Sequence, residues 1–350
     1  MGSNQRLALG LFVTALALQP AFAEGGGRLS VDQFSLLAER LHTSGSFKVR
    51  LQAALLLGVA GGADAEPLLV TTLQRDPDAP VRAAAALALG ETQDERAFDP
   101  LIASLSDEDS FFRTQVEKGL AELAQSVADG PMKLWAQLGR VPEVAQERGL
   151  AVLGSLGAGG VVGLCAAATM GSDSIKIAAK AELARLPADQ LDAGLRAALR
   201  RKDADSSPLA AAMLGDVGTP RSLPVLADAM SDPTQPSAVQ SEAHSALVRL
   251  SESIDPATEA RRFESEDPQE RLRAVVLSAI RGGPSAEALS LRALQDSNLR
   301  VQAAGASALA DLGSADALPL IKILLKREDE APIVRILEIA VRRLERKQEQ

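Results

Sequence analysis

The sequence is poor in the side chains that disulfides, metal sites and aromatic cores require. Its 350 residues include one cysteine, two histidines, one tryptophan and no tyrosine, and aromatic residues make up 3%. A lone Cys165 cannot form an internal disulfide, so the fold must be stable without one. Because alanine, leucine and valine carry most of the apolar fraction, the composition favours closely packed helices over a sheet-built core.

Positive charge is also in short supply. The formal net charge is −9 and the isoelectric point is near 5.0. An acidic chain with few aromatics is badly suited to neutralising phosphates or stacking on bases, so we expect no nucleic-acid binding. Anionic membrane surfaces would repel it on average.

Residues 1–23 have the pattern of a secretory signal peptide. Arg6 precedes an apolar run from Leu7 to Leu18, Pro20 follows, and an A-x-A cleavage site ends at Ala23. Such a run is shorter than the roughly 20 residues that span a bilayer. We therefore expect an exported protein, periplasmic or secreted, with no stable membrane anchor after cleavage and a short linker over 24–30. The alternatives are an uncleaved anchor or a buried N-terminal helix.

The rest of the chain repeats itself. Equivalent positions recur at intervals of 29 to 33 residues and cover the mature chain. The ten positions are Val49, Val81, Phe112, Val144, Ile175, Ser207, Val239, Leu272, Val301 and Val334. Each period contains two helical segments, with prolines near the start of the first helix (Pro67, Pro100, Pro224, Pro319) and glycine-rich joints after the second. A fixed period of this length indicates a stacked repeat architecture.

Charged residues recur in the same register. The residue after the repeat position is basic in six units: Arg50, Arg82, Arg113, Lys176, Arg273 and Arg335. In five units an aspartate lies five positions before the repeat position: Asp76, Asp107, Asp267, Asp296 and Asp329. We expect these aspartates to lie in inter-repeat turns, to cap the following helices and to form an Asp–Arg ladder along the array. The alternative is a basic stripe that binds an acidic ligand.

The repeats resemble the HEAT family, specifically the short bacterial HEAT-like repeats that also occur in phycobilisome lyase subunits. The segments "DPDAPVRAAAALALG", "EDPQERLRAVVLSAI" and "DSNLRVQAAGASALADLG" carry the resemblance. It implies an all-α fold, an α-solenoid of about ten helix–turn–helix repeats over 31–347, with the second helices lining an inner face. The pattern is irregular around 130–235, where Trp135 either fills a local gap or marks a kinked segment at which a partner docks.

No group of residues has the spacing of a catalytic, cofactor-binding or metal-binding site. His42 and His244 lie about 200 residues apart, and repeats in such an array contact only their neighbours. The segment "LGSLGAGGVVG" (153–163) follows a helix instead of a strand, so it is interpreted as a joint and not as a phosphate-binding loop. We predict no catalytic, cofactor or metal residues and no cofactor, and we expect the C-terminal helix to cap the array.

These observations favour a non-enzymatic, exported scaffold that binds another protein along the inner groove or near the irregular middle repeats, as an accessory to an envelope complex. The family resemblance implies an alternative, a lyase or chaperone-type subunit similar to the phycobilisome lyases. A purely structural spacer is a third hypothesis. The sequence does not identify the partner.

Overall fold

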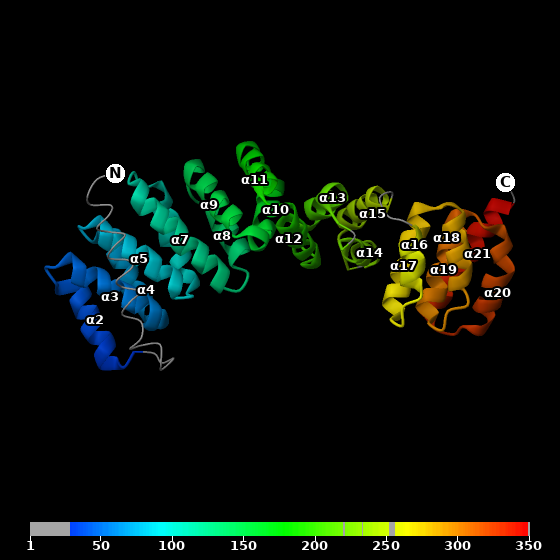
Figure 1. Ribbon diagram of the computed structural model, residues 1–350, viewed down its shortest axis with the longest axis horizontal. Coiled ribbons are helices and arrows are strands. Elements are labelled where there is room, and N and C mark those ends of the chain that lie inside the picture. The colour runs from blue at the N-terminus through cyan, green and yellow to red at the C-terminus, as the bar shows by residue number, and fades with distance from the viewer. Residues whose placement is uncertain (1–28, 220, 233, 252–255, 349–350) are drawn as a thin grey trace. The chain divides into compact units, whose positions relative to one another are not determined.

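The protein is all-α in the part of the chain that the computed structural model describes, residues 29–219, 221–232, 234–251 and 256–348. These residues form twenty α-helices, α2 to α21, which follow one another as ten helix–turn–helix pairs (Figure 1). Even-numbered labels mark the first helix of each pair and odd-numbered labels the second. The predicted signal peptide and most of the predicted linker lie outside the described residues.

The chain divides into two compact units between Gly194 and Leu195. The first unit contains five pairs and the first part of α12. Its helices are α2 (Val31–Thr43), α3 (Phe47–Ala60), α4 (Glu66–Arg75), α5 (Ala79–Glu91), α6 (Phe98–Ala103), α7 (Ser110–Ser126), α8 (Gly130–Leu138), α9 (Glu143–Ser155), α10 (Val161–Met170), α11 (Asp173–Arg185) and α12 (Ala188–Arg200).

The second unit continues with the same kind of pair. Its helices after α12 are α13 (Ser207–Val217), α14 (Leu223–Ser231), α15 (Ser237–Ser251), α16 (Pro256–Phe263), α17 (Pro268–Arg281), α18 (Gly283–Ala293), α19 (Leu299–Leu312), α20 (Leu318–Arg327) and α21 (Ala331–Gln348). The described residues within 130–235 therefore also form helix pairs, although the sequence pattern is weak there.

Local chemistry explains where many helices begin. Pro67, Pro224 and Pro319 lie in the first turns of α4, α14 and α20, where a missing N–H would have had no intrahelical partner. The side chains of Asp109 and Asp267 accept hydrogen bonds from the first backbone N–H groups of α7 and α17.

Small residues let the second helices approach one another closely. A Cβ atom added at Gly58 of α3 would lie 2.6 Å from Ala88 Cα of α5, and one at Gly90 would lie 2.5 Å from the Gly119 carbonyl oxygen of α7. On α5 the side of the helix around Gly90 is formed by Ala83 and Ala86, both fully buried. Alanine and glycine thus fix the spacing of these helices, as their abundance predicts.

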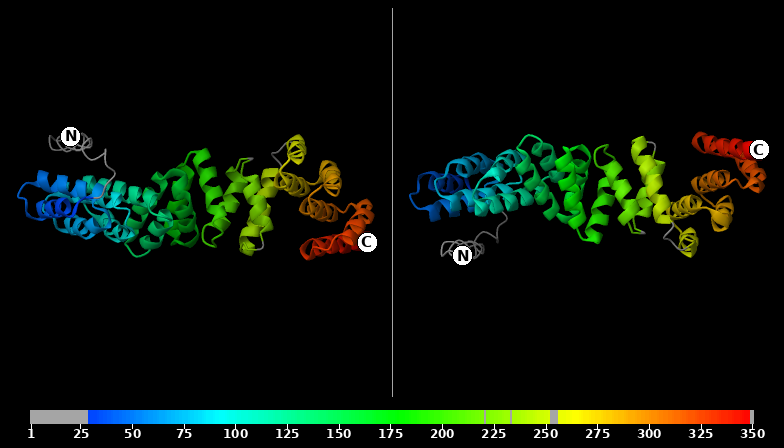
Figure 2. Two further views of the ribbon diagram at one scale, coloured as in Figure 1. Left: turned by 90° about the horizontal axis from the view of Figure 1, so that it is seen from below. Right: turned by 90° about the horizontal axis from the view of Figure 1, so that it is seen from above.

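Helix α21 has charged residues at the positions where α19 has a buried stripe of alanines. On α19 the stripe Ala303, Ala306 and Ala310 is buried against α21. The same three positions of α21 are Arg335, Glu338 and Arg342, and the side chains of Glu338 and Arg342 are 45% and 68% exposed and form an ion pair at 3.3 Å. The side views show α21 as the last described layer of its unit (Figure 2). A charged stripe is unfavourable for the close packing that the alanine stripe of α19 allows, and the role of α21 as a cap stays a prediction.

The residues at which the second helices begin show that four of the ten predicted repeat positions are wrong. Second helices begin 30 to 34 residues apart, and the repeat position is the third residue of each. Six assignments are correct, but Val144, Ser207, Leu272 and Val334 lie one or two residues away from the equivalent sites. Arg271, not Arg273, is therefore the residue of α17 equivalent to Arg82. In α21 the equivalent residue is Val334, not Arg335. The aspartates also lie within a pair, between its first and second helix, and not between repeats.

One joint contains a strained residue. Gln93, Gly157, Gly282 and Gly313 are each the fifteenth residue counted from the start of the second helix, and all four have positive φ. The left-handed conformation costs a non-glycine residue roughly 1–2 kcal/mol, whereas glycine adopts it freely. Gln93, at φ 57°, is exposed, so its side chain contributes little to packing.

We expect Gln93→Gly to raise the free energy of unfolding by about 0.5 kcal/mol, because the relieved strain exceeds the entropy that glycine adds to the unfolded chain. Urea unfolding monitored by circular dichroism measures the change. Gly62→Ala is the matched control, since Gly62 has φ 59° with open space around it, and we expect a loss of about 1 kcal/mol. A loss in the Gln93 variant would contradict this account of the joint.

Candidate protein-binding surface

In five of the helix pairs the turn is held by the fourth residue of the second helix. In four pairs this residue is an arginine whose Nη1 donates to the carbonyl six residues earlier, and in α19 a glutamine does the same. The pairs are Arg50 with Ser44, Arg82 with Asp76, Arg113 with Asp107, Arg271 with Ser265, and Gln302 with Asp296. The recurring basic residue is therefore first a local device that satisfies turn carbonyls.

Arg50 also reaches the next pair. Its Nε and Nη2 donate to the two carboxylate oxygens of Asp76 at 2.8 and 3.0 Å, and Nη2 donates to Asp78 at 2.6 Å. The Arg50 and Asp76 side chains are only 9% and 6% exposed. Asp76 accepts the N–H of Asp78 as well, so one carboxylate shapes its own turn and binds the preceding pair.

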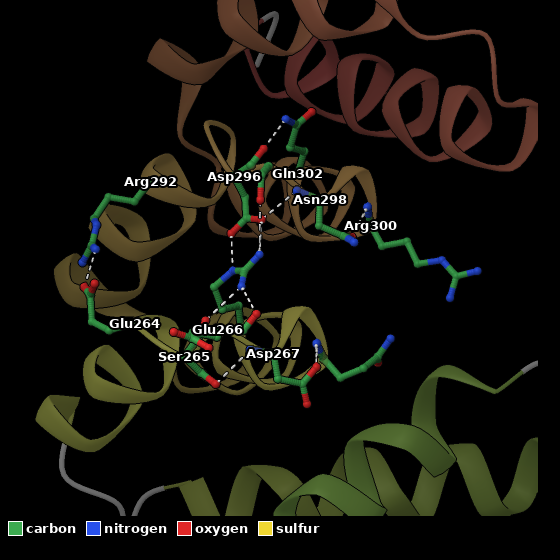
Figure 3. A network of polar contacts seen from close by, with 12 residues as sticks. Glu264, Ser265, Glu266, Asp267, Arg292, Asp296, Asn298, Arg300 and Gln302 are labelled. Carbon is green, nitrogen blue, oxygen red and sulfur yellow. Dashed lines mark hydrogen bonds and ion pairs between the residues drawn. The ribbon is translucent and has the colours of Figure 1, made fainter.

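Arg271 and Asp296 repeat this arrangement in the second unit. Arg271 donates to both oxygens of Asp296 at 2.7 and 2.9 Å, and Asp296 also accepts the N–H of Asn298 (Figure 3). Figure 3 shows Asp296, Asn298 and Gln302 on one side of this contact and Ser265, Glu266 and Asp267 on the other. The hydrogen bonds from Arg271 lower the pKa of Asp296.

The predicted Asp–Arg ladder exists in part. Within the described residues a third contact between successive turns joins Lys202 to Asp232 at 2.6 Å and lowers the pKa of Asp232 to about 2. Arg82 instead lies over the Phe112 ring, 5.5 Å from its centroid. Asp267 caps α17, and Arg273 pairs with Glu270 and Asp228. The arginines are thus engaged internally, which disfavours a basic stripe for an acidic ligand.

The lowered pKa of Asp296 makes its contribution dependent on pH. Stabilisation by a carboxylate with a lowered folded-state pKa is present above its ordinary pKa and is lost as the pH falls through the folded-state value. We expect Asp296→Asn to lower the urea midpoint at pH 7 and to differ less from the parent at pH 3. Asp107→Asn is the control, because Asp107 occupies the same turn position and accepts only the N–H of Asp109. A gap that widens on acidification would contradict the assignment.

Potential catalytic and metal-binding side chains do not converge in the described part of the chain. His42 is exposed in the last turn of α2, His244 is exposed on α15, and Cys165 is buried in α10. The described residues contain no group of three histidine, cysteine, aspartate or glutamate side chains that could hold a metal ion. No helix in the described ranges is long and apolar enough to cross a membrane.

A shallow hollow of about 280 Å³ lies at the joints between pairs, lined by Ala63, Thr92, Gln93, Asp94, Glu95 and Val127. Its carboxylates already have partners: Arg96 binds Asp94 at 2.6 Å and Lys133 binds Glu95. The hydrogen bonds from Arg96 lower the pKa of Asp94. The hollow is therefore a surface of satisfied ion pairs.

Three exposed apolar side chains lie near the start of α9, at the end of α10 and in the first half of α11. Val144, Met170 and Ile177 are 57%, 58% and 70% exposed. Ser174 of α11 donates a hydrogen bond to Glu143 of α9, so the two helices are close at this point. Val144 follows Glu143, and Ile177 lies one turn after Ser174. Met170 is the last residue of α10, just before α11. We call Val144, Met170 and Ile177 the α9–α11 edge. Exposed apolar groups that lie together mark interaction sites more often than isolated ones do.

This edge lies inside the range 130–235 that the sequence marks as irregular. Trp135, the residue singled out there, is half-buried in α8, and the glycine segment 153–163 forms the end of α9, the 3-10 turn Gly157–Gly160 and the start of α10. Sequence reasoning missed the edge, because an exposed valine or isoleucine in a helix looks like a core residue until the neighbouring helices are placed.

Comparisons with known proteins agree with the repeat. Residues 34–121 match the family model for HEAT repeats. No curated protein sequence is significantly similar to the chain. Among solved structures, an engineered protein is 19% identical with a TM-score of 0.45, covering 89% of this chain and 98% of its own. Human deoxyhypusine hydroxylase in complex with glycerol is 16% identical with a TM-score of 0.28, covering 90% and 96%.

The matched range runs from α2 into α7, and helix pairs of the same kind continue to α21. The low TM-scores carry no weight here, so the assignment depends on the family model and on the helix pairs themselves. Residues 34–121 of this chain are HEAT repeats.

Proposed function

We propose that this chain is an exported, non-enzymatic scaffold that binds another protein at the α9–α11 edge, as an accessory to an envelope complex. HEAT repeats generally present extended surfaces to protein partners. The observation that supports this location is the exposure of Val144, Met170 and Ile177 within one neighbourhood of the first unit. The export half of the proposal rests on the signal-peptide pattern of residues 1–23.

The non-enzymatic part of the proposal rests on where reactive side chains lie. General acid–base chemistry needs groups within hydrogen-bonding reach of one substrate. The histidines belong to different units and the thiol is buried. Many aspartates in the turns serve as caps or partners of arginine and lysine, which gives them a structural task.

Affinity purification of the tagged mature chain from its own cells, after mild crosslinking, tests the binding site. We expect one stoichiometric envelope protein, and we expect Val144→Asp/Ile177→Asp to lose it because burying a carboxylate at the contact is costly. Val31→Asp is the matched control, since Val31 is 82% exposed on α2 and distant in sequence from the edge. Retention of the partner by the double variant would contradict the site.

The mass of the protein from the envelope fraction tests export separately. We expect a chain that begins at Glu24. A full-length chain in the cytoplasmic fraction would contradict the export half of the proposal and leave the binding half to the crosslinking experiment.

A further inference from the structure

The pair α16–α17 has a buried polar residue where eight of the other pairs have a buried leucine or valine. The eleventh residue of the second helix is a fully buried leucine in seven pairs: Leu57, Leu89, Leu120, Leu153, Leu183, Leu247 and Leu309. It is the buried Val341 in α21, whereas in α13 it is Val217, which is 41% exposed. In α17 alone it is a serine, Ser278, which is 1% exposed.

A buried ion pair accompanies this serine. Glu259 of α16 is 1% exposed, and its Oε2 accepts a hydrogen bond from Arg281 Nη2 at 2.5 Å, one turn after Ser278 on α17. Within the described residues, Glu259 Oε1, Arg281 Nη1 and Ser278 Oγ are buried without a hydrogen-bond partner. Two of these three unpartnered atoms belong to the ion pair that joins α16 to α17, and the third lies one turn earlier on α17.

This core weakens the attachment of α16. A buried ion pair loses most of its attraction to the desolvation of its two charges, and each unpartnered polar atom adds a further cost. Burial raises the pKa of Glu259 even though Arg281 opposes the shift, so desolvation outweighs the ion pair at this carboxylate. The helix has eight residues, too few to be stable without its contacts.

Phe263 is the one large apolar side chain of α16. Phe263 is 7% exposed and packs with Ala274 and Val275 of α17, and the guanidinium of Arg292 lies 5.0 Å from its ring centroid. Arg292 also pairs with Glu264 at 2.5 Å, but both side chains are more than half exposed, which limits what that pair contributes.

From this juxtaposition of Glu259, Ser278 and Arg281 we infer that α16 is a releasable helix. It detaches from α17 while the pairs on either side stay folded, and its release uncovers the apolar seat formed by Ala274, Val275 and Phe263. Because Phe263 belongs to α16 and leaves with it, the part of the seat that stays on α17 is Ala274 and Val275. Repeat arrays permit such local opening because each pair contacts only its neighbours. The device is independent of the α9–α11 edge, which lies in the other unit.

Hydrogen exchange of the full chain, followed by mass spectrometry, tests the inference. We expect the amides of 257–263 to exchange at least tenfold faster than those of α4, whose pair has the leucine core, and of the neighbouring helix α18. The triple variant Glu259→Leu/Ser278→Leu/Arg281→Met is expected to slow exchange in α16 at least tenfold and to leave α4 unchanged. Ser290→Ala, at another buried hydroxyl without a partner, is the control and should leave α16 unchanged.

Equal protection of α16, α4 and α18 in the parent protein would overturn the inference, as would a triple variant that exchanges like the parent. Arg281→Met provides a second arm, because it leaves Glu259 buried alone and needs no repacking by leucine. Faster exchange confined to α16 supports release of this helix. Equally fast exchange of all helices from α13 to α21 would show that α16 does not open by itself and would overturn it.

Discussion

Gly90→Ala is expected to lower the free energy of unfolding by about 3 kcal/mol, although alanine favours helix formation by roughly 1 kcal/mol over glycine. The added Cβ would lie 2.5 Å from the carbonyl oxygen and 2.9 Å from the Cα of Gly119. These are backbone atoms of α7 and cannot move alone, so α5 and α7 must separate. The separation loosens contacts along the buried stripe of Ala83 and Ala86.

Gly154→Ala is the matched control, because Gly154 of α9 occupies the same helical position as Gly90. A Cβ there would lie 2.7 Å from a carboxylate oxygen of Glu182, the end of a flexible side chain that can turn away. We expect no loss, or a gain of up to about 1 kcal/mol from helix propensity. Urea unfolding of both variants measures the difference. Equal losses would show that backbone contact between second helices does not set their spacing.

Much of the fold could be predicted because the repeat period and the residues that begin and end helices are visible in the sequence. Proline in the first turn and glycine after the second helix mark the pairs. The alanines and glycine of "DPDAPVRAAAALALG" predict that this helix packs closely against its neighbours. The register slipped in α17 because Leu272, an apolar residue, was aligned with Val81, although the equivalent third residue is Glu270. The structure places the charged Glu270 there, a choice that hydrophobic pattern alone cannot anticipate.

The polar core of α16–α17 and the α9–α11 edge could not be predicted for a common reason. Glu259 lies in "PATEARRF", which reads as a solvated helix, yet the residue is almost fully buried. Ile177 lies in "SIKIAAK", which reads as core, yet it is 70% exposed. Each position depends on how closely the neighbouring pair approaches, and that distance is a tertiary property that no local pattern encodes.

Arg50→Met is expected to lower the free energy of unfolding by about 3 kcal/mol, because it leaves the buried carboxylate of Asp76 without its charged partner. The variant also frees the Ser44 carbonyl. Arg82→Met is the matched control at the same position of the next pair. Arg82 donates to turn carbonyls and lies over Phe112, so we expect a loss of only about 1 kcal/mol.

A second substitution separates the two sources of the loss. Asp76→Asn removes the buried charge but keeps an oxygen that can accept the N–H of Asp78. If the unpaired charge dominates, Arg50→Met/Asp76→Asn is more stable than Arg50→Met alone, and a double-mutant cycle gives the coupling. Additive losses would mean that the two side chains act independently. The contact between the first two pairs would then depend on apolar packing, and the recurring Asp–Arg register would reflect turn formation within each pair.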